Sequence, residues 1–271
     1  MIETQPDPGL VVLLGKVGGE TGLGCSAYKQ SCLRRRIAVR MRACRVQTYA
    51  EYEAVLDREP EEYERLLDTL TINVTKFYRN RDTWETLATR VLPDLWQRCN
   101  GSVRCWSAGC SSGEEPYTLV ILLLELSRRG GNASRLVGRV DATDLDRESI
   151  AKAQEGRYRD AAFEEMPPAL VVRYFSEGRP KTILPSVKQN VRFQRHDIIL
   201  EPPPDPPYHL IICRNVLIYF DRPTQERLLW QFADALTPGG YLVLGKTETL
   251  FGTVRERLEL VAARERIYRL P

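Results

Sequence analysis

The sequence predicts an α/β fold, with a mostly parallel sheet covered by helices on both faces, preceded by an all-α N-terminal domain. Two observations predict this arrangement. From Val103 onward, short apolar strands alternate with helical segments, which is typical of parallel sheets buried on both faces. Before residue 71, apolar residues recur at helical spacing and no strand pattern occurs. We therefore expect a helical domain over residues 1–70 and an α/β domain over residues 71–271.

The N-terminal segment contains two predicted helical regions. Tyr28–Cys44 carries apolar residues about one turn apart, and Glu51–Leu70 forms one stretch or a pair of helices, interrupted at Pro60. Between the apolar start of the chain and Tyr28, Gly15–Gly24 is rich in glycine, which predicts a loop. The apolar stripe of the first region consists of Leu33, Ile37, Met41 and Cys44.

A polar and aromatic connector, Thr71–Arg81, links this segment to the next helix. Asp82 is predicted to be the N-cap of that helix, because Glu85 follows three residues later as in a capping box. The apolar stripe of the helix consists of Trp84, Leu87, Val91 and Leu95.

The α/β region then proceeds element by element. The predicted strands are Val103–Ser107, Leu136–Ala142, His209–Cys213, Tyr241–Leu244 and Arg266–Leu270. The predicted helices are Glu115–Arg128, Asp146–Gln154 and the segment after Asp221. Short apolar groups between Phe175 and Phe193, ending with Val191 and Phe193, predict a small antiparallel β insertion at about 176–193 rather than a continuation of the main sheet.

The segment Trp106–Tyr117 is the first candidate site. A strand runs into a turn of small residues, and Pro116 opens a helix, where its missing N–H costs nothing. Small residues let a ligand approach the backbone. The spacing matches neither the dinucleotide fingerprint nor the P-loop, and Glu114 and Glu115 favour a ligand with a positive charge and hydroxyls over a phosphate. The alternative is an ordinary strand-to-helix turn.

Two further segments place polar residues after strands. Asp144 follows the second predicted strand, where an acid is placed to bind ribose hydroxyls. Asp146 is the better N-cap of the next helix, which Gly156 ends, so Asp144 is the stronger ligand candidate. Arg214 and Asn215 follow a buried strand in the same way. The alternatives are a turn residue for Asp144 and a plain strand end for the other two.

Asp205–Tyr208 spells the Asp-Pro-Pro-Tyr motif of methyltransferases that modify amino groups of nucleic acids. In those enzymes the motif follows the fourth strand, whereas here it precedes an apolar strand, within the proline-rich loop Glu201–Pro207. We therefore interpret it as a coincidence.

The helix over Lys29–Arg45 has seven basic residues and no acidic one. Four of them fall within an arc of about 100° on a helix of ~100° per residue: Arg34, Arg35, Arg42 and Arg45. Such an edge suits an acidic surface or a phosphate backbone. The alternative is a solvated face that pairs with the acidic stretch Glu51–Glu64.

Composition narrows the class of protein. The 39 Lys and Arg residues against 36 Asp and Glu give a net charge of +3, too small for a general nucleic-acid coat or a membrane-surface protein. The longest apolar run, Leu119–Leu124, is far shorter than the ~20 residues of a membrane span, and Met1–Gly9 shows no signal-peptide pattern. Seven cysteines without Cys-x-x-Cys spacing and two histidines argue against zinc and disulfides. We expect a reduced, cytoplasmic protein.

With these segments in order, the sequence resembles the CheR family of chemoreceptor glutamate O-methyltransferases. The resemblance spans Leu10 to Leu270 and depends on four blocks: Leu70–Arg79, Trp106–Tyr117, Ala142–Asp146 and Cys213–Phe220. It implies a class I (Rossmann-like) methyltransferase domain with S-adenosylmethionine as methyl donor and S-adenosylhomocysteine as product. It also implies that the helical domain docks on the cytoplasmic helical bundle of chemoreceptors, at receptor clusters, through the four arginines of the basic edge.

Carried onto matching positions, the resemblance implies a set of cofactor-binding residues and two catalytic residues. The cofactor-binding residues are Asn73, Thr75, Arg79, Glu115, Asp144, Asp197, Ile198, Arg214 and Asn215. Arg79 and Tyr219 are implied to lie nearest the transferred methyl group. No metal, nucleic acid or membrane insertion is implied, and the oligomeric state is left open.

The chain departs from the family pattern at three places. It reads Phe77-Tyr78 where the family often has two phenylalanines, and Gly245-Lys246-Thr247-Glu248 where the family often has Gly-His-Ser-Glu. The β insertion is short, so capture of a receptor's tethering peptide is not expected. Two other classes stay open: a nucleic-acid methyltransferase that uses the basic helix, and a non-catalytic adaptor, which is disfavoured because Glu115 and Asp144 are present.

Overall fold

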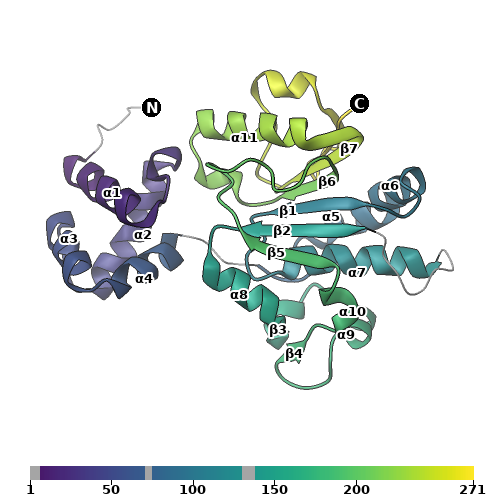
Figure 1. Ribbon diagram of the computed structural model, residues 1–271, viewed down its shortest axis with the longest axis horizontal. Coiled ribbons are helices and arrows are strands. Elements are labelled where there is room, and N and C mark those ends of the chain that lie inside the picture. The colour runs from purple at the N-terminus through teal and green to yellow at the C-terminus, as the bar shows by residue number, and fades with distance from the viewer. Residues whose placement is uncertain (1–6, 71–74, 130–137) are drawn as a thin grey trace. The chain divides into compact units, whose positions relative to one another are not determined.

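The computed structural model describes residues 7–70, 75–129 and 138–271 (Figure 1). The chain forms two compact units. The helical unit comprises Met1–Ile72 together with Tyr219–Gln225, and the α/β unit comprises Asn73–Ile218 and Glu226–Pro271. A short segment from the middle of the α/β sequence therefore packs with the N-terminal helices.

The helical unit is built as predicted from helices, and a Leu, Ile, Tyr and Val core holds it together. Its helices are α1 (Pro8–Thr21), η1 (Cys25–Ala27), α2 (Gln30–Ala43), α3 (Tyr49–Arg58) and α4 (Glu61–Leu70). Pro60 lies between α3 and α4, which confirms a pair of helices there. Thr48 and Glu51 form a complete capping box at the start of α3.

The predicted loop at Gly15–Gly24 is wrong, because α1 continues to Thr21 and ends at a left-handed Gly22. Asp7 caps the helix by accepting a hydrogen bond from the Gly9 N–H. Burial of the apolar face of α1 outweighs the low helix propensity of its glycines, which costs about 1 kcal/mol per residue. The buried residues of this face are Leu10, Leu13, Leu14 and Val17.

The segment Tyr219–Gln225 joins the helical unit through a short antiparallel bridge. The rings of Tyr28 and Phe220 meet edge to face with centroids 4.9 Å apart. On either side, the Lys29 N–H donates to the Tyr219 carbonyl and the Asp221 N–H donates to the Ala27 carbonyl, both at 2.9 Å. The helical unit is thus completed by residues that lie about 150 positions further along the chain.

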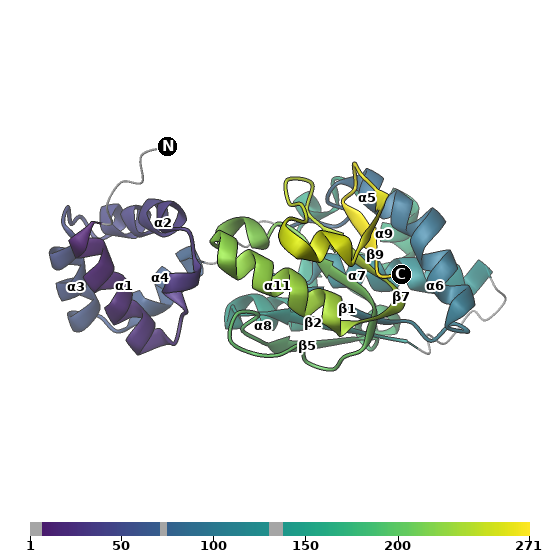
Figure 2. The same cartoon turned by 90° about the horizontal axis from the view of Figure 1, so that it is seen from above.

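The α/β unit contains a seven-stranded sheet in the order β5-β2-β1-β6-β7-β9-β8. Figure 1 shows β5, β2, β1, β6 and β7 in this order, and Figure 2 labels β9 beside β7. The first five strands in this order are mutually parallel, and β9 is antiparallel to both of its neighbours. The strands are β1 (Arg104–Ala108), β2 (Arg139–Asp144), β5 (Val191–Arg195), β6 (Tyr208–Cys213), β7 (Leu236–Leu244), β8 (Glu259–Ala262) and β9 (Ile267–Arg269). The expected α/β class is confirmed.

Side chains of β1 alternate between the two faces of this sheet. Cys105 packs in the core cluster that contains Leu119 and Tyr117 of α7 (Glu114–Arg129). Trp106 packs on Phe232 of α11 (Arg222–Ala235), with ring centroids 5.5 Å apart. Both faces are therefore covered, as near-continuous apolar strands predict.

The remaining helices of the α/β unit include a run before β1. That run consists of α5 (Arg81–Thr86), η2 (Leu87–Val91) and α6 (Leu92–Arg98). The apolar stripe that the sequence predicts for it is buried: Trp84, Leu87, Val91 and Leu95. The other helices are α8 (Arg147–Glu155), η3 (Asp160–Phe163), α9 (Pro168–Tyr174), α10 (Pro185–Lys188), η4 (Leu217–Tyr219) and η5 (Gly252–Glu256). The predicted N-cap Asp82 is wrong: Asn80 holds the N-cap position, and Asp82 lies in the first turn, where it pairs with Lys246 at 2.5 Å.

A small antiparallel sheet exists, but its strands differ from those predicted within 176–193. It pairs β3 (Arg157–Tyr158) with β4 (Lys181–Thr182). Val191 and Phe193 belong instead to β5, which pairs in parallel with β2 at the edge of the main sheet. Their alternating pattern reflects the partly exposed position of an edge strand rather than membership of a separate sheet.

Candidate functional site

The carboxyl ends of the parallel strands gather most of the predicted site residues at one edge of the main sheet. β1 leads into the Gly109–Gly113 turn, β2 ends at Asp144, and β6 leads into Arg214 and Asn215. Ligands of open α/β sheets bind outside this edge. The edge is therefore the candidate site.

The turn after β1 is fixed to the end of β2 by its backbone. The N–H groups of Gly109 and Cys110 both donate to the Thr143 carbonyl, at 2.8 and 2.9 Å. Gly109 has φ 79°, and a Cβ there would lie 2.4 Å from a Val216 methyl carbon. Glycine is required at this position, because both the left-handed conformation and the close approach exclude a side chain.

Asp144 anchors the same turn while it stays partly exposed. Its carboxylate accepts hydrogen bonds from the Ser111 N–H at 2.8 Å and from the Asp146 N–H at 3.0 Å. Burial raises the pKa of Asp144, and the N–H donors oppose this shift. Asp146 caps α8 by accepting from the Glu148 N–H, and Gly156 ends that helix, so both helix-end predictions are confirmed.

Glu115 and Arg214 form a buried ion pair at the centre of the edge, with 3.4 Å between Oε2 and Nη1. The Ser107 hydroxyl donates to the other oxygen of Glu115 at 2.9 Å. Burial raises the pKa of Glu115 and lowers that of Arg214, and each partner opposes the shift of the other. Glu115 of α7 and Arg214, which follows β6, therefore meet beside Ser107 of β1, although 99 positions separate the two charged residues in the sequence.

Arg214 also fixes the segment before α5. Its Nη2 donates to the Arg79 carbonyl and to the Asn80 side-chain oxygen, both at 2.8 Å, and its guanidinium lies 5.6 Å from the Trp84 ring centroid. Arg79 is therefore brought beside Glu115 and Arg214. Thr75, four residues before Arg79, is partly buried, and Asn73 lies outside the described residues.

Asn215 adopts a left-handed backbone with φ 62°. Its side-chain Oδ1 is buried and has no hydrogen-bond partner among the described residues. Its N–H donates to Glu248 at 2.9 Å. Glu248 was not among the sequence-predicted site residues; the one available signal was its place at the end of the Gly245–Glu248 departure from the family pattern.

Asp197 and Ile198 follow β5 at the same edge. The His196 N–H, one residue earlier, donates to the Asp144 carbonyl at 2.9 Å, so this segment lies against the end of β2. The Asp197 carboxylate is buried and accepts from the Ile199 N–H at 2.8 Å. Asp197 therefore shapes the turn, while the side chain of Ile198 is partly exposed.

Tyr219 and the basic helix belong to the helical unit. The Arg36 guanidinium lies over the Tyr219 ring, 5.3 Å from its centroid, and donates to the carbonyls of Thr69 and Leu70 at 2.7 and 2.6 Å. Arg40 forms a two-hydrogen-bond ion pair with the buried Glu62, at 2.8 and 2.7 Å. These two arginines serve the interior of the unit.

The other basic side chains of α2 and its end are exposed. None of them forms an ion pair with a residue in the described part of the chain: Arg34, Arg35, Arg42 and Arg45. The acidic stretch after α2 is engaged instead by Arg40, through Glu62. Val39, 44% exposed, lies one turn from both Arg35 and Arg42 on the same helix.

The Asp205–Tyr208 motif lies at the wrong end of its strand for catalysis. Tyr208 begins β6, at the amino edge of the sheet. Its hydroxyl lies 3.2 Å from Asp141, and Asp205 pairs with Arg104 at 2.9 Å and with Arg139. These contacts give the motif a structural role in place of a catalytic one.

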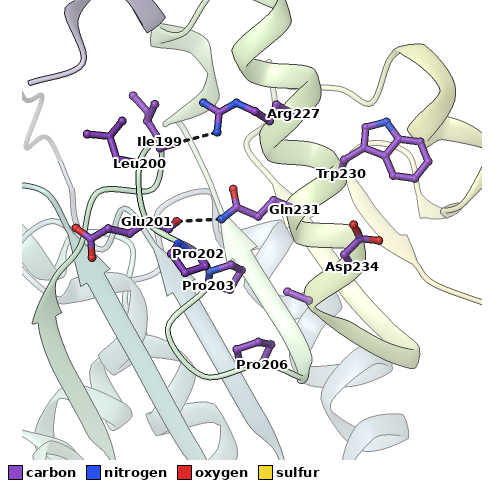
Figure 3. Close-up of a pocket in the computed structure, with 11 residues that line it drawn as sticks. Ile199, Leu200, Glu201, Pro202, Pro203, Pro206, Arg227, Trp230, Gln231 and Asp234 are labelled. Atoms are coloured by element: carbon purple, nitrogen blue, oxygen red, sulfur yellow. Dashed lines mark hydrogen bonds between the residues drawn. The ribbon is translucent and has the colours of Figure 1, made fainter.

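A pocket of about 590 Å³ lies between the proline-rich loop and α11 (Figure 3). Arg227 donates to the Ile199 carbonyl at 2.9 Å and Gln231 donates to the Glu201 carbonyl at 3.1 Å, so the loop is tied to the helix. None of the sequence-predicted cofactor residues lines this pocket.

In the described part of the chain, no helix is long and apolar enough to cross a membrane.

The side chains at the sheet edge fit the chemical groups of S-adenosylmethionine. Guanidinium groups of Arg79 and Arg214 suit its carboxylate, and the acids Glu115 and Asp144 suit its ammonium and ribose hydroxyls. The Asn215 Oδ1, which has no partner within the described parts of the chain, adds a buried acceptor that a ligand donor would satisfy.

Comparison with known proteins gives matches over most of the chain. The family model "CheR methyltransferase, SAM binding domain" matches residues 73–267, and "CheR methyltransferase, all-alpha domain" matches residues 12–71. A chemotaxis protein methyltransferase from Listeria monocytogenes is 34% identical over 236 residues, which cover 85% of this chain and 86% of that protein. One from Klebsiella aerogenes is also 34% identical, over 84% of this chain and 78% of that protein. Among solved structures, PKMT2 from Rickettsia typhi aligns with a TM-score of 0.40 and 13% identity, covering 63% of this chain and 26% of that one.

Proposed function

The chain belongs to the CheR methyltransferase family, with S-adenosylmethionine as cofactor, and from this premise we propose that it methylates glutamate side chains of chemoreceptors. The products would be glutamate methyl esters formed during sensory adaptation. Chemotaxis protein methyltransferases are among its relatives, at 34% identity.

One observation carries the choice of acceptor: among the described residues, both histidines are held by backbone contacts, and the cysteines beside the arginines and carboxylates are buried thiols. His196 bonds through Nε2 to the Pro202 carbonyl, and His209 Nδ1 accepts from the Arg104 N–H at the amino edge. Burial raises the pKa of Cys110 and Cys213, so both stay thiols. A carboxylate acceptor is already ionised at neutral pH and needs no general base, unlike an amine or hydroxyl acceptor.

The cofactor supplies an electrophilic methyl group on a sulfonium. The protein's part is to orient the acceptor carboxylate in line with the methyl–sulfur bond and to exclude water. Arg79 would hold one carboxylate oxygen and Tyr219 would orient it by hydrogen bonding. Too tight an arginine–carboxylate pair would stabilise the ground state and slow the transfer, so Arg79 is expected to share its contacts with the cofactor.

The exposed edge of α2 supports docking on an acidic helical partner. Arg35 and Arg42 offer positive charge on either side of Val39, and an acidic helix with apolar residues on one face would match all three. We propose the cytoplasmic helical bundle of a receptor as this partner, which places the enzyme at receptor clusters in the cytoplasm.

The test is methyl transfer from labelled S-adenosylmethionine to membranes of the source organism, followed by mild alkali. Label on a receptor-sized band that alkali releases as volatile methanol supports a carboxyl methyl ester. Alkali-stable label contradicts the proposal and indicates nitrogen methylation, with transfer to RNA or DNA as the direct check. No transfer despite S-adenosylhomocysteine binding, with purified chemoreceptors present, would indicate a non-catalytic adaptor.

A further inference from the structure

The turns after β6 and β7 meet at one buried carboxylate, that of Glu248, which is 5% exposed. Its Oε2 accepts from the N–H groups of Asn215 at 2.9 Å and Gly245 at 2.6 Å. Its Oε1 accepts from the Ile218 N–H at 3.2 Å. One side chain therefore holds both ends of the Asn215–Ile218 turn against the end of the neighbouring strand.

This turn needs an external acceptor. Asn215 is left-handed, with φ 62°, a conformation that a non-glycine residue keeps only where its surroundings enforce it. The N–H groups of Asn215 and Ile218 point inward to Glu248, and a buried N–H without a partner is costly. Without the carboxylate, the turn would lose the contacts that fix the direction of the Asn215 side chain.

Glu248 and the Asn215 backbone pack closely on Gly245. A Cβ on Gly245 would lie 2.7 Å from Glu248 Oε2 and 2.8 Å from the Asn215 nitrogen. Burial raises the pKa of Glu248, and the backbone N–H donors of Asn215, Gly245, Ile218 and Leu217 oppose this shift. Both carboxylate oxygens thus accept hydrogen bonds from backbone N–H groups.

We propose that Glu248 is a positioning residue: it sets the Asn215–Ile218 turn in the shape that binds S-adenosylmethionine through Asn215. The proposal deepens the proposed function, because it rests on the cofactor role of Asn215. It does not depend on which side chain receives the methyl group.

The isosteric variant Glu248→Gln and the truncation Glu248→Ala separate the individual contacts. An amide has one acceptor oxygen and an NH₂ donor. With its oxygen at the Oε2 position it keeps the bonds from Asn215 and Gly245, and its NH₂ then opposes the Ile218 N–H. The reverse orientation, with the amide oxygen at the Oε1 position, would lose the two hydrogen bonds from Asn215 and Gly245. Gln is therefore expected to lose the Ile218 contact while it keeps those of Asn215 and Gly245, and Ala to lose every contact of the carboxylate.

The experiment measures S-adenosylhomocysteine binding by calorimetry and amide exchange by NMR on the full chain. In Glu248→Gln the Ile218 amide should exchange faster while the Asn215 amide stays protected, and the Kd should rise about threefold. In Glu248→Ala both amides should exchange faster, and the Kd should rise about tenfold or more. Glu259→Gln, at an exposed carboxylate on β8, is the control and should match the wild type.

Wild-type Kd values in both variants would overturn the proposal, as would unchanged protection of the Ile218 amide in Glu248→Gln. If Glu248→Ala does not fold, the Gln variant decides alone. If the predicted binding order holds but receptors gain no methyl ester, only the proposed acceptor fails.

Discussion

Glu114 is a buried acid that opens α7 and whose carboxylate oxygens both accept from the Ser112 hydroxyl, at 3.1 and 2.8 Å. Burial raises the pKa of Glu114 from 4.5 to about 7. The folded state therefore holds a proton that the unfolded state releases above pH 4.5. Stability is full below that pH and falls as pH rises towards about 7, because the folded protein must then bury a charge.

We predict that Glu114→Gln removes this pH dependence. Relative to the wild type, the variant should gain stability between pH 5 and pH 8, by an amount on the order of 3 kcal/mol from the pKa difference. Denaturant unfolding of both proteins at several pH values measures the gap. Parallel curves would contradict the prediction, and the exposed Glu256, changed to Gln, is the control.

Arg79 is the residue on which the proposed chemistry depends most. Its main-chain carbonyl accepts from the Trp84 ring N–H at 3.2 Å and from Arg214 at 2.8 Å. Arg79→Ala keeps these main-chain contacts, so the fold should survive while kcat falls about a hundredfold or more, as for loss of one transition-state donor. Turnover on the true acceptor, with circular dichroism for the fold, measures this. A wild-type rate would remove Arg79 from the mechanism.

The basic residues of helix α2 point in two directions. Arg36 and Arg40 face inward and satisfy the end of α4 and Glu62, whereas Arg35 and Arg42 face solvent. The absence of acids along the helix made a charged surface predictable. Which arginines remain outside was decided by packing, because each inward arginine needed an acceptor supplied by another helix.

We predict that the double reversal Arg35→Glu and Arg42→Glu raises the KM for the receptor about tenfold, since like charges then oppose docking. S-adenosylhomocysteine binding should stay unchanged. The effect should shrink at high salt, which screens exposed charges.

Arg255→Glu with Arg264→Glu is the matched control, because these exposed arginines of the α/β unit give the same change in net charge. An equal loss in both double variants would contradict specific docking. Weakened cofactor binding in the first would indicate misfolding.

At the scale of the whole molecule, the helical unit is discontinuous in sequence. Phe220 is 2% exposed and packs on Tyr28, beside the hydrogen bond from the Lys29 N–H to the Tyr219 carbonyl. A residue encoded within the α/β region thus stabilises the N-terminal helices.

We predict that Phe220→Ala speeds exchange of the Lys29 amide and destabilises the helical unit by about 3 kcal/mol, the usual cost of emptying a buried aromatic site. Amide exchange resolved by residue measures both. Phe193→Ala is the control: it removes a ring that packs on Tyr117 in the α/β unit, and it should leave the Lys29 amide unchanged. Equal effects of the two variants would contradict the assignment.

The α/β class, the helical N-terminal region and the caps at Asp146 and Gly156 could be predicted from the sequence, because they follow from apolar periodicity and local hydrogen bonding. Strand ends also placed Asp144 and Arg214 at one edge, since parallel strands share their carboxyl ends. Local patterns failed at Gly15–Gly24, where burial of the apolar face of α1 outweighed propensity, and at Asp82, where the helix begins earlier, after the N-cap Asn80.

The contacts between distant segments could not be predicted from the sequence and depend on the folded chain. It set Val191–Arg195 beside β2, joined Glu115 to Arg214, attached Tyr219 to the helical unit and aimed Glu248 at the Asn215 turn. Periodicity reports which face of an element is apolar, but it carries no information about the element that covers that face. A buried donor's partner is fixed only when strand order and register bring the two together.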